Sequence, residues 1–316
     1  MALYLITGGA GFIGSHIVEE LVQRGESVRV LDNLSTGHEE NLATVRGEID
    51  FRQADIRDLA SIRPLFAGAD YVIHLAALAS VVRSMEDPVE TTLVNLNGTL
   101  HVLLAARDAH AKRVVMAATA AAYGDDPALP RVETQKPQPL SPYALTKLAG
   151  EYYGQIFTRY FGLEVVALRF FNIFGPRQDP GSPYTGALSK FIVAYIRGTA
   201  LTIFGDGEQS RDFTYVANVV DATLRACLAA AAPGQVINVG TGRSFTLNQT
   251  ISLLNAIFGV KVKPQYAPPR VGDVRHSTAD ISLARAALGY EPIVSFEDGL
   301  RRTVDWLRAA LAGARK

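Results

Sequence analysis

The sequence is poor in cysteine and carries no excess of either charge. Cys227 is the only cysteine among 316 residues, which excludes an internal disulfide and any metal site built from several thiolates. The six histidines are spread along the chain without the spacing of a metal site, so we expect no metal. The 31 basic and 31 acidic side chains cancel, and nothing in this balance favours a polyanion such as nucleic acid as a partner.

Long apolar runs are missing as well. No stretch of 18 uncharged apolar residues occurs, so we expect no membrane-spanning helix and no membrane partner. The apolar start, residues 1–14, follows no basic segment and is interrupted by four glycines, which is unlike a secretory signal. We therefore expect a soluble, cytoplasmic protein.

The remaining composition is that of a globular protein. With 48% hydrophobic and 20% charged residues, disordered, collagen-like and coiled-coil chains are excluded. A length of 316 residues suits one large α/β domain or two interlocked lobes.

The first half alternates short, β-branched runs with helix-like segments. The expected strands are Leu3–Thr7, Val28–Leu31, Phe51–Gln53, Tyr71–Leu75, Arg113–Ala117 and Val165–Arg169. The expected helices are Phe12–Arg24, Ile62–Phe66, Pro88–Ala109 and Pro142–Tyr160. This alternation predicts right-handed crossovers and a doubly wound parallel sheet, an α/β fold with helices on both faces.

After about residue 169 the regular alternation fades, and prolines and glycines separate shorter elements. We expect residues 1–170 to form a nucleotide-binding domain and residues 171–316 mainly a substrate-binding lobe. About 212–243 should return to the first domain, with Val236–Val239 as a strand. The last expected helix is Phe296–Leu311, with Ser295 as its N-cap.

A glycine-rich turn lies between the first strand and the first helix. Gly9, Gly11 and Gly14 fit G-x-G-x-x-G, and Gly8, Gly11 and Gly14 fit a second glycine spacing. Such a turn lets the backbone approach a diphosphate, which the N–H groups at the helix start can bind. An ordinary tight turn would also explain the glycines by themselves. The strand that follows the helix is needed to distinguish such a turn from a dinucleotide site.

Asp32 ends that second strand, 18 residues after Gly14. An acid at this place accepts hydrogen bonds from the adenosine ribose hydroxyls and repels a 2′-phosphate. The order strand, glycines, helix, strand and acid therefore predicts a dinucleotide site that prefers NAD to NADP.

Tyr143 and Lys147 lie four residues apart at the start of an expected helix, so both point from one face. A tyrosine with its ordinary pKa of about 10 is a poor base at neutral pH. A nearby lysine ammonium and the positive nicotinamide ring together favour the phenolate. A plain Tyr–Lys pair on a solvated helix is the alternative.

Together these features resemble the extended short-chain dehydrogenase/reductase family, and in it the nucleotide-sugar epimerases of the UDP-glucose 4-epimerase type. The resemblance runs nearly end to end. It rests on the glycines, on Tyr143 and Lys147, and on the segments at 32–37, 55–56, 74–77, 95–99, 169–172, 175–178, 211–213 and 270–273. It implies a Rossmann-type fold with a smaller C-terminal substrate-binding lobe.

The resemblance also implies which residues contact NAD. They are Gly8, Gly11, Phe12, Ile13, Gly14, Asp32, Asn33, Ser35, Thr36, Gly37, Asp55, Ile56, Leu75, Ala76, Ala77, Ala79, Asn95, Tyr143, Lys147 and Phe171. Phe12 and Ile13 would follow the pyrophosphate, and Asp55 with Ile56 would contact adenine.

By the same resemblance, a second set would contact a UDP-sugar. It comprises Ser84, Thr119, Tyr143, Phe171, Asn172, Leu188, Phe204, Arg211, Arg270, Asp273 and Ser277. Two guanidiniums, Arg211 and Arg270, suit the forked hydrogen bonds of a diphosphate, although surface arginines would need no such role.

Thr119 is the implied third catalytic residue, four positions before Tyr123, and its hydroxyl would bridge the sugar O4 to the Tyr143 phenolate. Alanines surround it where relatives usually have more hydroxyls. Ala120 and Ala121 also stand where the family's sugar 4,6-dehydratases carry an acid pair for eliminating water. The alanines therefore favour an isomerase, a 4-epimerase that works through a transient 4-keto sugar and regenerates NAD in place.

The sugar itself stays open. Ser277 occupies the position that limits room beside sugar C2 in this family, and a small side chain there favours UDP-GlcNAc and UDP-GalNAc besides UDP-Glc and UDP-Gal. Ser277 could equally be a plain loop hydroxyl. Arg83 leaves a UDP-uronic acid 4-epimerase possible, because it could pair with a carboxylate, or it could be a solvated helix charge.

A non-catalytic NAD-binding sensor is the alternative from another class of protein, and the intact Tyr143 and Lys147 oppose it. The family also implies a homodimer, joined through a bundle of the Pro88–Ala109 and Pro142–Tyr160 helices. Apolar helix faces in these segments could equally pack on the sheet.

Overall fold

A seven-stranded parallel sheet forms the centre of the computed structural model, which describes residues 1–179, 187–269 and 274–313. Its order is β11-β6-β5-β4-β1-β2-β3, and all neighbours pair in parallel. The strands are β1 (Leu3–Thr7), β2 (Ser27–Asp32), β3 (Asp50–Gln53), β4 (Tyr71–His74), β5 (Arg113–Thr119), β6 (Glu164–Phe170) and β11 (Val236–Val239). The chain leaves β1 toward β2 and β3 and then returns to β4, so the direction of winding reverses between β1 and β4. Open α/β sheets bind their ligands at such a reversal.

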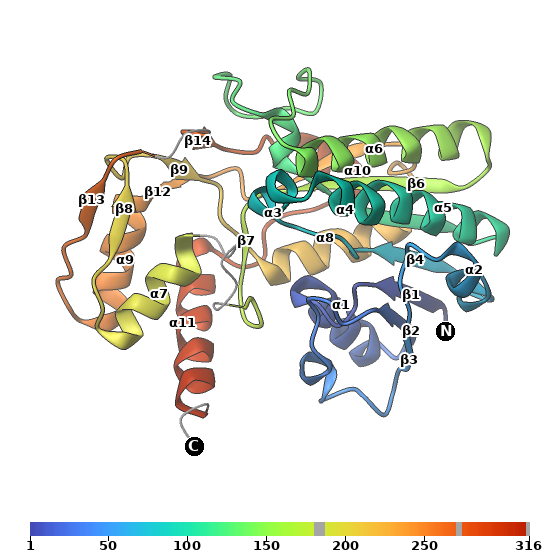
Figure 1. Ribbon diagram of the computed structural model, residues 1–316, viewed down its shortest axis with the longest axis horizontal. Helices are drawn as coiled ribbons and strands as arrows, with labels where there is room; N and C mark the ends of the chain where they lie inside the picture. The colour runs from blue at the N-terminus through green and yellow to red at the C-terminus, as the bar shows by residue number, and fades with distance from the viewer. Residues whose placement is uncertain (180–186, 270–273, 314–316) are drawn as a thin grey trace.

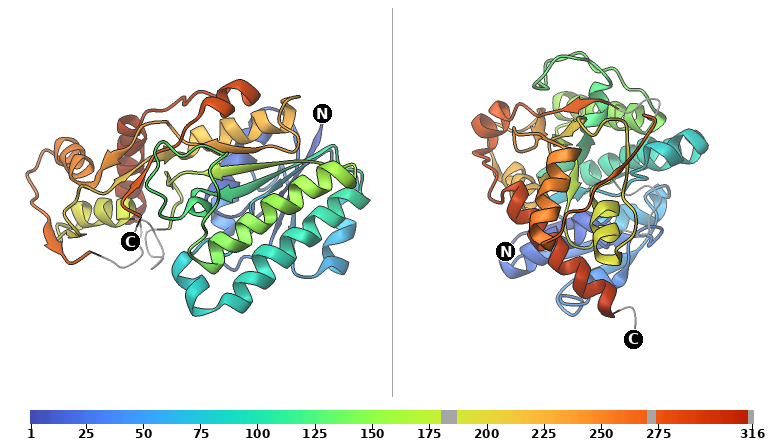
Figure 2. Two further views of the ribbon diagram at one scale, coloured as in Figure 1. Left: turned by 90° about the horizontal axis from the view of Figure 1, so that it is seen from above. Right: turned by 90° about the vertical axis from the view of Figure 1, so that its left-hand side faces the viewer.

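Helices cover both faces of this sheet (Figures 1 and 2). On one face lie α1 (Phe12–Gln23), α8 (Val216–Leu228) and α10 (Ser282–Leu288), and on the other α5 (Gly98–Asp108) and α6 (Pro142–Tyr160). Strand residues alternate between the two layers, because successive side chains point to opposite faces. Ile6, Ile73, Val115 and Val166 pack with the first layer, and their neighbours Leu5, Val72, Val114 and Val165 with the second.

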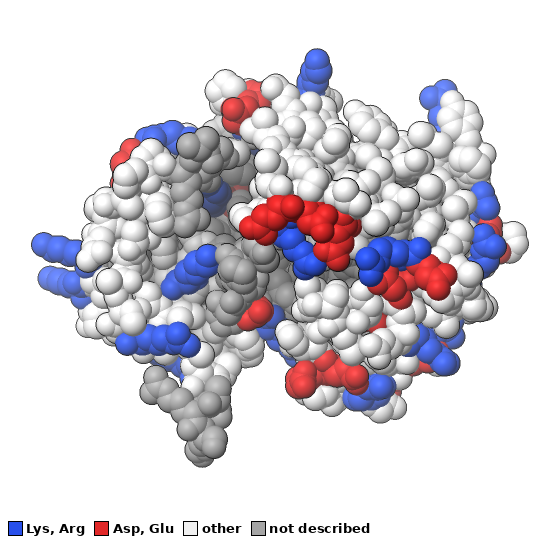
Figure 3. Space-filling model, viewed as in Figure 1, with Lys and Arg blue, Asp and Glu red and all other residues white. Residues whose placement is uncertain are grey.

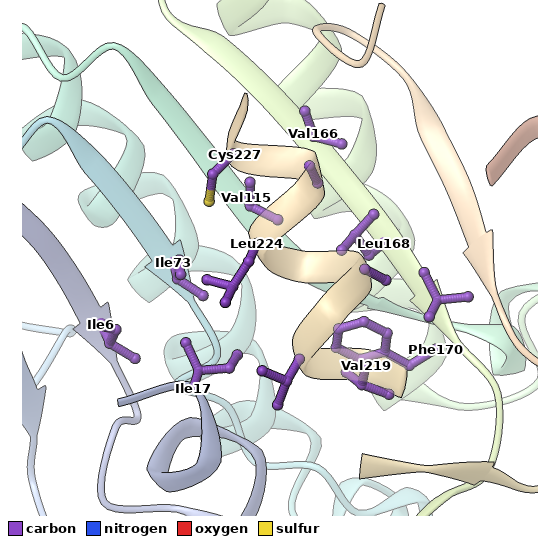
Figure 4. Close-up of a cluster of buried hydrophobic side chains, with 14 of the residues drawn as sticks. Ile6, Ile17, Ile73, Val115, Val166, Leu168, Phe170, Val219, Leu224 and Cys227 are labelled. Carbon is purple, nitrogen blue, oxygen red and sulfur yellow. The ribbon is translucent and has the colours of Figure 1, made fainter. Parts of the chain in front are cut away.

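The first layer shows how α8 closes the core (Figure 4). Leu224 and Cys227 of α8 lie over the sheet, in one cluster with Val115 and Leu168, and all four are buried. Burial raises the pKa of the Cys227 thiol to about 12, so it stays protonated and packs as a small apolar side chain.

Two expected helices differ in detail from the structure. The segment expected as one helix, Pro88–Ala109, consists of α4 (Pro88–Thr92), a π-helical turn η3 (Leu93–Asn97) and α5, with α3 (Val81–Glu86) before it. The helix expected at Ile62–Phe66 begins three residues earlier, as α2 (Leu59–Ile62). Asp58 caps it there by accepting hydrogen bonds from two backbone N–H groups. It then continues as the 3₁₀ turn η2 (Arg63–Phe66).

A smaller lobe, on the left of Figure 1, has its own apolar core. Its helices are α7 (Ala187–Arg197), α9 (Leu247–Phe258) and α11 (Phe296–Gly313), and its short strands are β7 (Ile173–Phe174), β8 (Thr202–Phe204), β9 (Ser210–Arg211), β10 (Thr214–Tyr215), β12 (Phe245–Thr246), β13 (Gln265–Ala267) and β14 (His276–Ser277). Aromatic rings at its centre, Phe174, Phe213 and Phe296, contact one another. As expected, Ser295 caps α11, since its hydroxyl accepts a hydrogen bond from the Asp298 N–H at 3.1 Å.

The chain passes between the large domain and this lobe several times. It enters the lobe after β6, returns as α8 and β11, enters again as β12 and α9, and returns once more as α10. Both units are therefore built from separate stretches of sequence. None of the helices in the described ranges has the length and apolar character needed to cross a membrane.

Candidate active site

The glycine turn connects β1 to α1 at the carboxyl edge of the sheet. Gly8 has a φ of +72°, and a Cβ there would lie 2.7 Å from the Ala76 backbone nitrogen. A Cβ on Gly14 would collide with the Gly8 carbonyl oxygen. Gly11 is the N-cap of α1 and provides no side-chain hydrogen bond to the first-turn N–H groups. A cradle without side chains at a helix N-terminus fits a diphosphate.

Asp32 lies directly beside this turn, at the end of β2. Its carboxylate accepts hydrogen bonds from the Ala10 N–H at 3.0 Å and the Leu34 N–H at 2.9 Å. Burial raises the pKa of Asp32, and these backbone donors oppose the rise. A Cβ on Gly37 would lie 3.0 Å from the same carboxylate, so the loop with Asn33, Ser35 and Thr36 returns closely over Asp32.

Asp55 and Ile56 lie near that loop, as the Asn33 amide donates to Asp55 at 3.0 Å. Arg57 donates to both oxygens of Asp55 at 3.0 and 2.7 Å and lowers the pKa of its carboxyl. The side chain of Asp55 is therefore already paired. Ile56 is buried, and its carbonyl accepts a hydrogen bond from His101 at 3.0 Å.

Asn95 fixes the loop with Leu75, Ala76, Ala77 and Ala79 after β4. Its amide oxygen accepts from the Leu78 N–H at 2.8 Å, and its amide nitrogen donates to the Leu78 carbonyl at 3.2 Å. These bonds come from the π-helical turn η3, a distortion that is common near functional sites.

Thr119, Tyr143 and Lys147 are brought together from two elements. Thr119 ends β5, and the other two lie in the first turns of α6, which begins with Ser141 capping the Ala144 N–H at 3.2 Å. The Thr119 hydroxyl lies beside the Tyr143 phenol and favours its ionised form. The Lys147 ammonium donates to the Ala117 carbonyl at 2.9 Å, two residues before Thr119.

The electrostatics of this trio are dominated by burial. Burial raises the pKa of Tyr143, and the Thr119 hydroxyl opposes that rise only in part. Burial also lowers the pKa of Lys147 to about 8. In the protein without a bound cofactor, burial therefore holds the pKa of Tyr143 above its ordinary value and favours the neutral phenol.

Two of the expected substrate residues lie in register. Ser277 of β14 pairs with Arg211 of β9, and the Asp212 N–H donates to the Ser277 carbonyl at 2.8 Å. Asn172 follows β6 with a φ of +32°, and its amide donates to the Asp212 carbonyl at 3.2 Å. Phe171 is fully buried against the Tyr123 ring.

Other expected substrate residues are placed differently. Leu188 is buried in the core of the smaller lobe, while Phe204 is 37% exposed at the end of β8. The buried Ser84 hydroxyl donates to the Val81 carbonyl of its own helix at 2.6 Å. Arg270 and Asp273 lie outside the described residues.

Comparison with known proteins assigns this arrangement to a family. The model of the NAD dependent epimerase/dehydratase family matches residues 4–240. The chain belongs to this family. The resemblance inferred from the sequence is thereby confirmed, together with the Rossmann-type fold, NAD as the cofactor and an isomerase as the class of enzyme.

Three similar proteins match this member of the epimerase family along nearly its whole length. The UDP-glucose 4-epimerase of Mycolicibacterium smegmatis is 38% identical over 313 residues, which cover 96% of this chain and 98% of that protein. A structure of UDP-glucose 4-epimerase with UDP-glucose from Thermotoga maritima has a TM-score of 0.93 and 41% identity, with 98% and 99% covered. UDP-N-acetylglucosamine 4-epimerase from Methanobrevibacter ruminantium, in complex with UDP-N-acetylmuramic acid, has a TM-score of 0.94 and 38% identity, again with 98% and 99% covered.

In this epimerase-family enzyme, Asp212 has a place that the sequence did not indicate. It is fully buried, and its carboxylate accepts hydrogen bonds from the Thr241 N–H and hydroxyl at 2.8 and 2.7 Å, the Gly242 N–H at 3.0 Å and the Ala279 N–H at 3.1 Å. It thus joins three segments next to Arg211. An acid between an arginine and a phenylalanine was the only local pattern, and it does not reveal partners 29 to 67 residues away.

Basic and acidic side chains are intermixed on the surface of the enzyme. On the face shown in Figure 3, basic and acidic side chains lie next to one another over much of the large domain. Arg83, considered above for a carboxylate substrate, pairs with Glu90 at 2.7 Å. Across residues 1–179, 187–269 and 274–313, no group of three His, Cys, Asp or Glu side chains could hold a metal ion.

Proposed function

We propose that this enzyme is a 4-epimerase of UDP-hexoses that interconverts UDP-Glc with UDP-Gal, UDP-GlcNAc with UDP-GalNAc, or both pairs. The observation that supports it most is the contact between Thr119 and Tyr143, with Lys147 one turn further along α6. This trio lies at the same edge of the sheet as the glycine turn. An acid–base group beside a dinucleotide site is what a reversible oxidation at a sugar hydroxyl requires.

In this mechanism Tyr143 moves one proton. As phenolate it removes the proton of the sugar 4-hydroxyl, with Thr119 as a hydrogen-bonded relay, and it later returns the proton to the 4-oxygen. NAD, when bound, would take up the C4 hydride and, once the 4-keto sugar has turned over about its diphosphate, would return it to the opposite face of C4. Lys147 holds the nicotinamide ribose and adds positive charge next to the phenolate, which lowers the pKa that burial raises.

The side chains around Thr119 favour epimerisation over elimination. Residues 120–122 are alanines within the 3₁₀ turn η4 (Ala120–Tyr123), and Thr119 caps this turn by accepting from the Ala121 N–H at 3.1 Å. No carboxyl group is present there to remove a second proton or to protonate a leaving hydroxyl. Epimerisation needs one base only.

Ser277 supports room for an acetylated sugar. Its pairing in register with Arg211, the expected diphosphate ligand, supports a position near the bound substrate. A tyrosine there would fill space that a serine leaves open, so we expect Ser277→Tyr to lower turnover of UDP-GlcNAc more than that of UDP-Glc. Equal effects on the two substrates would contradict this assignment.

The functional test is incubation with UDP-Glc, UDP-GlcNAc and UDP-GlcA, without added NAD, followed by separation of the products. We expect 4-epimers of the first two sugars, because bound NAD is regenerated in each cycle. Turnover of UDP-GlcA alone would favour the uronic acid epimerase, although the Glu90 partner of Arg83 argues against a free guanidinium for that carboxylate.

Tyr143→Phe separates an enzyme from a non-catalytic NAD sensor. We expect the variant to fold and retain NAD, with its rate lowered by at least a hundredfold, since it lacks the proton acceptor. Wild-type turnover in Tyr143→Phe would overturn the proposed mechanism, and absence of turnover in the wild type on all three sugars would favour the sensor.

A further inference from the structure

One stripe of α1 faces the smaller lobe. Phe12, Ser15, His16 and Glu19 are spaced three to four residues apart, so they lie on one side of the helix. The Phe12 ring packs against the core of the lobe and meets the His16 ring edge-on, with 6.1 Å between ring centroids. The helix whose N-terminus fits the diphosphate therefore also contacts the lobe.

The loop after β7 bonds to this stripe at three points. His16 Nε2–H donates to the Pro176 carbonyl at 3.0 Å, and Arg177 donates to Glu19 at 2.6 Å and to the Ser15 hydroxyl at 3.3 Å. The Arg177 and Glu19 side chains are only 19% and 18% exposed. We call these five residues, Ser15, His16, Glu19, Pro176 and Arg177, the interlobe latch.

The backbone of the latch is strained. Arg177 has a φ of +67°, in the left-handed region that is unfavourable for a non-glycine residue because its Cβ approaches the following carbonyl oxygen. The loop is also fixed on its other side, where Gln178 donates to the Ile173 carbonyl at 3.2 Å and accepts from Ser189 of α7 at 2.8 Å. Such conformations persist only where the surrounding contacts enforce them, and they gather at ligand clamps.

We propose that the interlobe latch slows the departure of NAD by fixing the lobe against the helix that binds the diphosphate. Glu19 and Arg177 are then positioning residues for cofactor retention. An enzyme that oxidises and then reduces the same sugar must keep its dinucleotide through both half-reactions, which gives such a latch its purpose. The inference requires NAD binding but not a particular sugar.

The test is the rate at which the holoenzyme exchanges bound NAD for labelled NAD added in excess. Glu19→Gln retains an acceptor for the Thr44 hydroxyl but loses the charge that Arg177 binds. Arg177→Gly removes the guanidinium and, at the same time, relieves the positive φ. We expect each variant to exchange NAD at least tenfold faster than the wild type.

A matched control is Asp50→Asn, which breaks the Arg29–Asp50 ion pair of 2.7 Å at the amino end of β3, away from the carboxyl edge of the sheet. We expect its NAD exchange to stay within twofold of the wild type. Arg177→Gly also separates retention from stability, because it should exchange NAD faster without a lower melting temperature.

Two results would overturn the proposal: unchanged NAD exchange in both latch variants, or equal acceleration in Asp50→Asn. If either latch variant fails to fold, His16→Phe tests the Pro176 hydrogen bond by the same measurement, with the same tenfold acceleration expected. The exchange assay needs no sugar, so failure of the proposed epimerisation would leave its result interpretable.

Discussion

At the scale of single residues, Lys147 opposes the stability of the fold that contains it. It is 5% exposed, and burial lowers its pKa to about 8 from the ordinary value of 10.5. The folded state therefore binds this proton less readily than the unfolded state. The resulting penalty is fully present below pH 8 and disappears as the pH rises from 8 to 10.5.

We predict that Lys147→Met abolishes most of the activity and removes this pH dependence. Relative to that of the variant, the free energy of unfolding of the wild type should rise by about 3 kcal/mol between pH 8 and 10.5, from 1.36 kcal/mol per pKa unit, because buried groups such as Cys227 titrate alike in both proteins. Urea unfolding of the cofactor-free proteins at a series of pH values measures both curves. Parallel curves would show that the lysine is not held in a costly charged state.

Local motifs predicted the residues that depend on local geometry. The glycine turn, Asp32, Tyr143 and Lys147 each follow from a strand end or from the spacing of one helix turn. The pairing of Arg83 with Glu90 did not follow, because it depends on how α3 and α4 are arranged around Asp87.

At the scale of elements, the positions of the sheet strands could be predicted. The segment from 88 to 109 was predicted as helical, but its division into α4, η3 and α5 was not. Buried parallel strands are continuous apolar runs, so their positions are evident in the sequence. The π-helical turn at Asn95 was not, because its cause is distant: Asn95 bonds to Leu78, and a Cβ on Gly98 would lie 2.6 Å from the Ile56 side chain. Helix propensities describe single residues of the segment, so they predict neither of these contacts.

Asp212 gives the prediction at this scale, since its carboxylate joins its own segment to the segments at Thr241 and Ala279. Asp212→Asn places an amide NH₂ group against N–H donors, and we expect the free energy of unfolding to fall by about 2–4 kcal/mol. Because Arg211 and Ser277 lie beside it, KM for the UDP-sugar should rise more than kcat falls. Denaturant unfolding and steady-state kinetics measure the two effects.

Asp206→Asn is the control for this change. Asp206 pairs with Arg275 at 2.8 Å, but both side chains are more than half exposed, so solvent screens the pair and the loss should be much smaller than for Asp212→Asn. Equal destabilisation by both variants would show that the buried hydrogen bonds of Asp212 are not what stabilises this region.

At the scale of the whole molecule, the smaller lobe was only predicted in outline. Its core collects side chains from α7, α9, α11 and short strands that are distant in sequence, and aromatic contacts such as Phe174 with Phe296 join them. Two-residue strands carry too little periodicity to be found from a sequence. The order of the large sheet, by contrast, follows from its strand–helix alternation.

An apolar stripe on the outer face of the large domain gives the last prediction. α5 and α6 lie side by side, with α4 against α6 (Figure 2). Exposed apolar side chains on α4, the turn η3 and α6 are Val89, Leu93, Leu145, Tyr152, Ile156 and Tyr160, with exposed fractions of 43–69%. On α6 they recur at seven, four and four residues, which places them on one face of the helix.

A contiguous apolar face of this kind is typical of an interface, and we propose that two copies of the chain meet there. We expect the wild type to sediment with the mass of a dimer at micromolar concentration, and Val89→Glu combined with Ile156→Glu to sediment as a folded monomer. Buried carboxylates facing each other across the symmetric interface would cost far more than the apolar contact gains. Ile293→Glu, at a 61% exposed position outside this face, should remain dimeric. A monomeric wild type would refute the dimer, and a dimeric double variant would place the interface elsewhere on the surface.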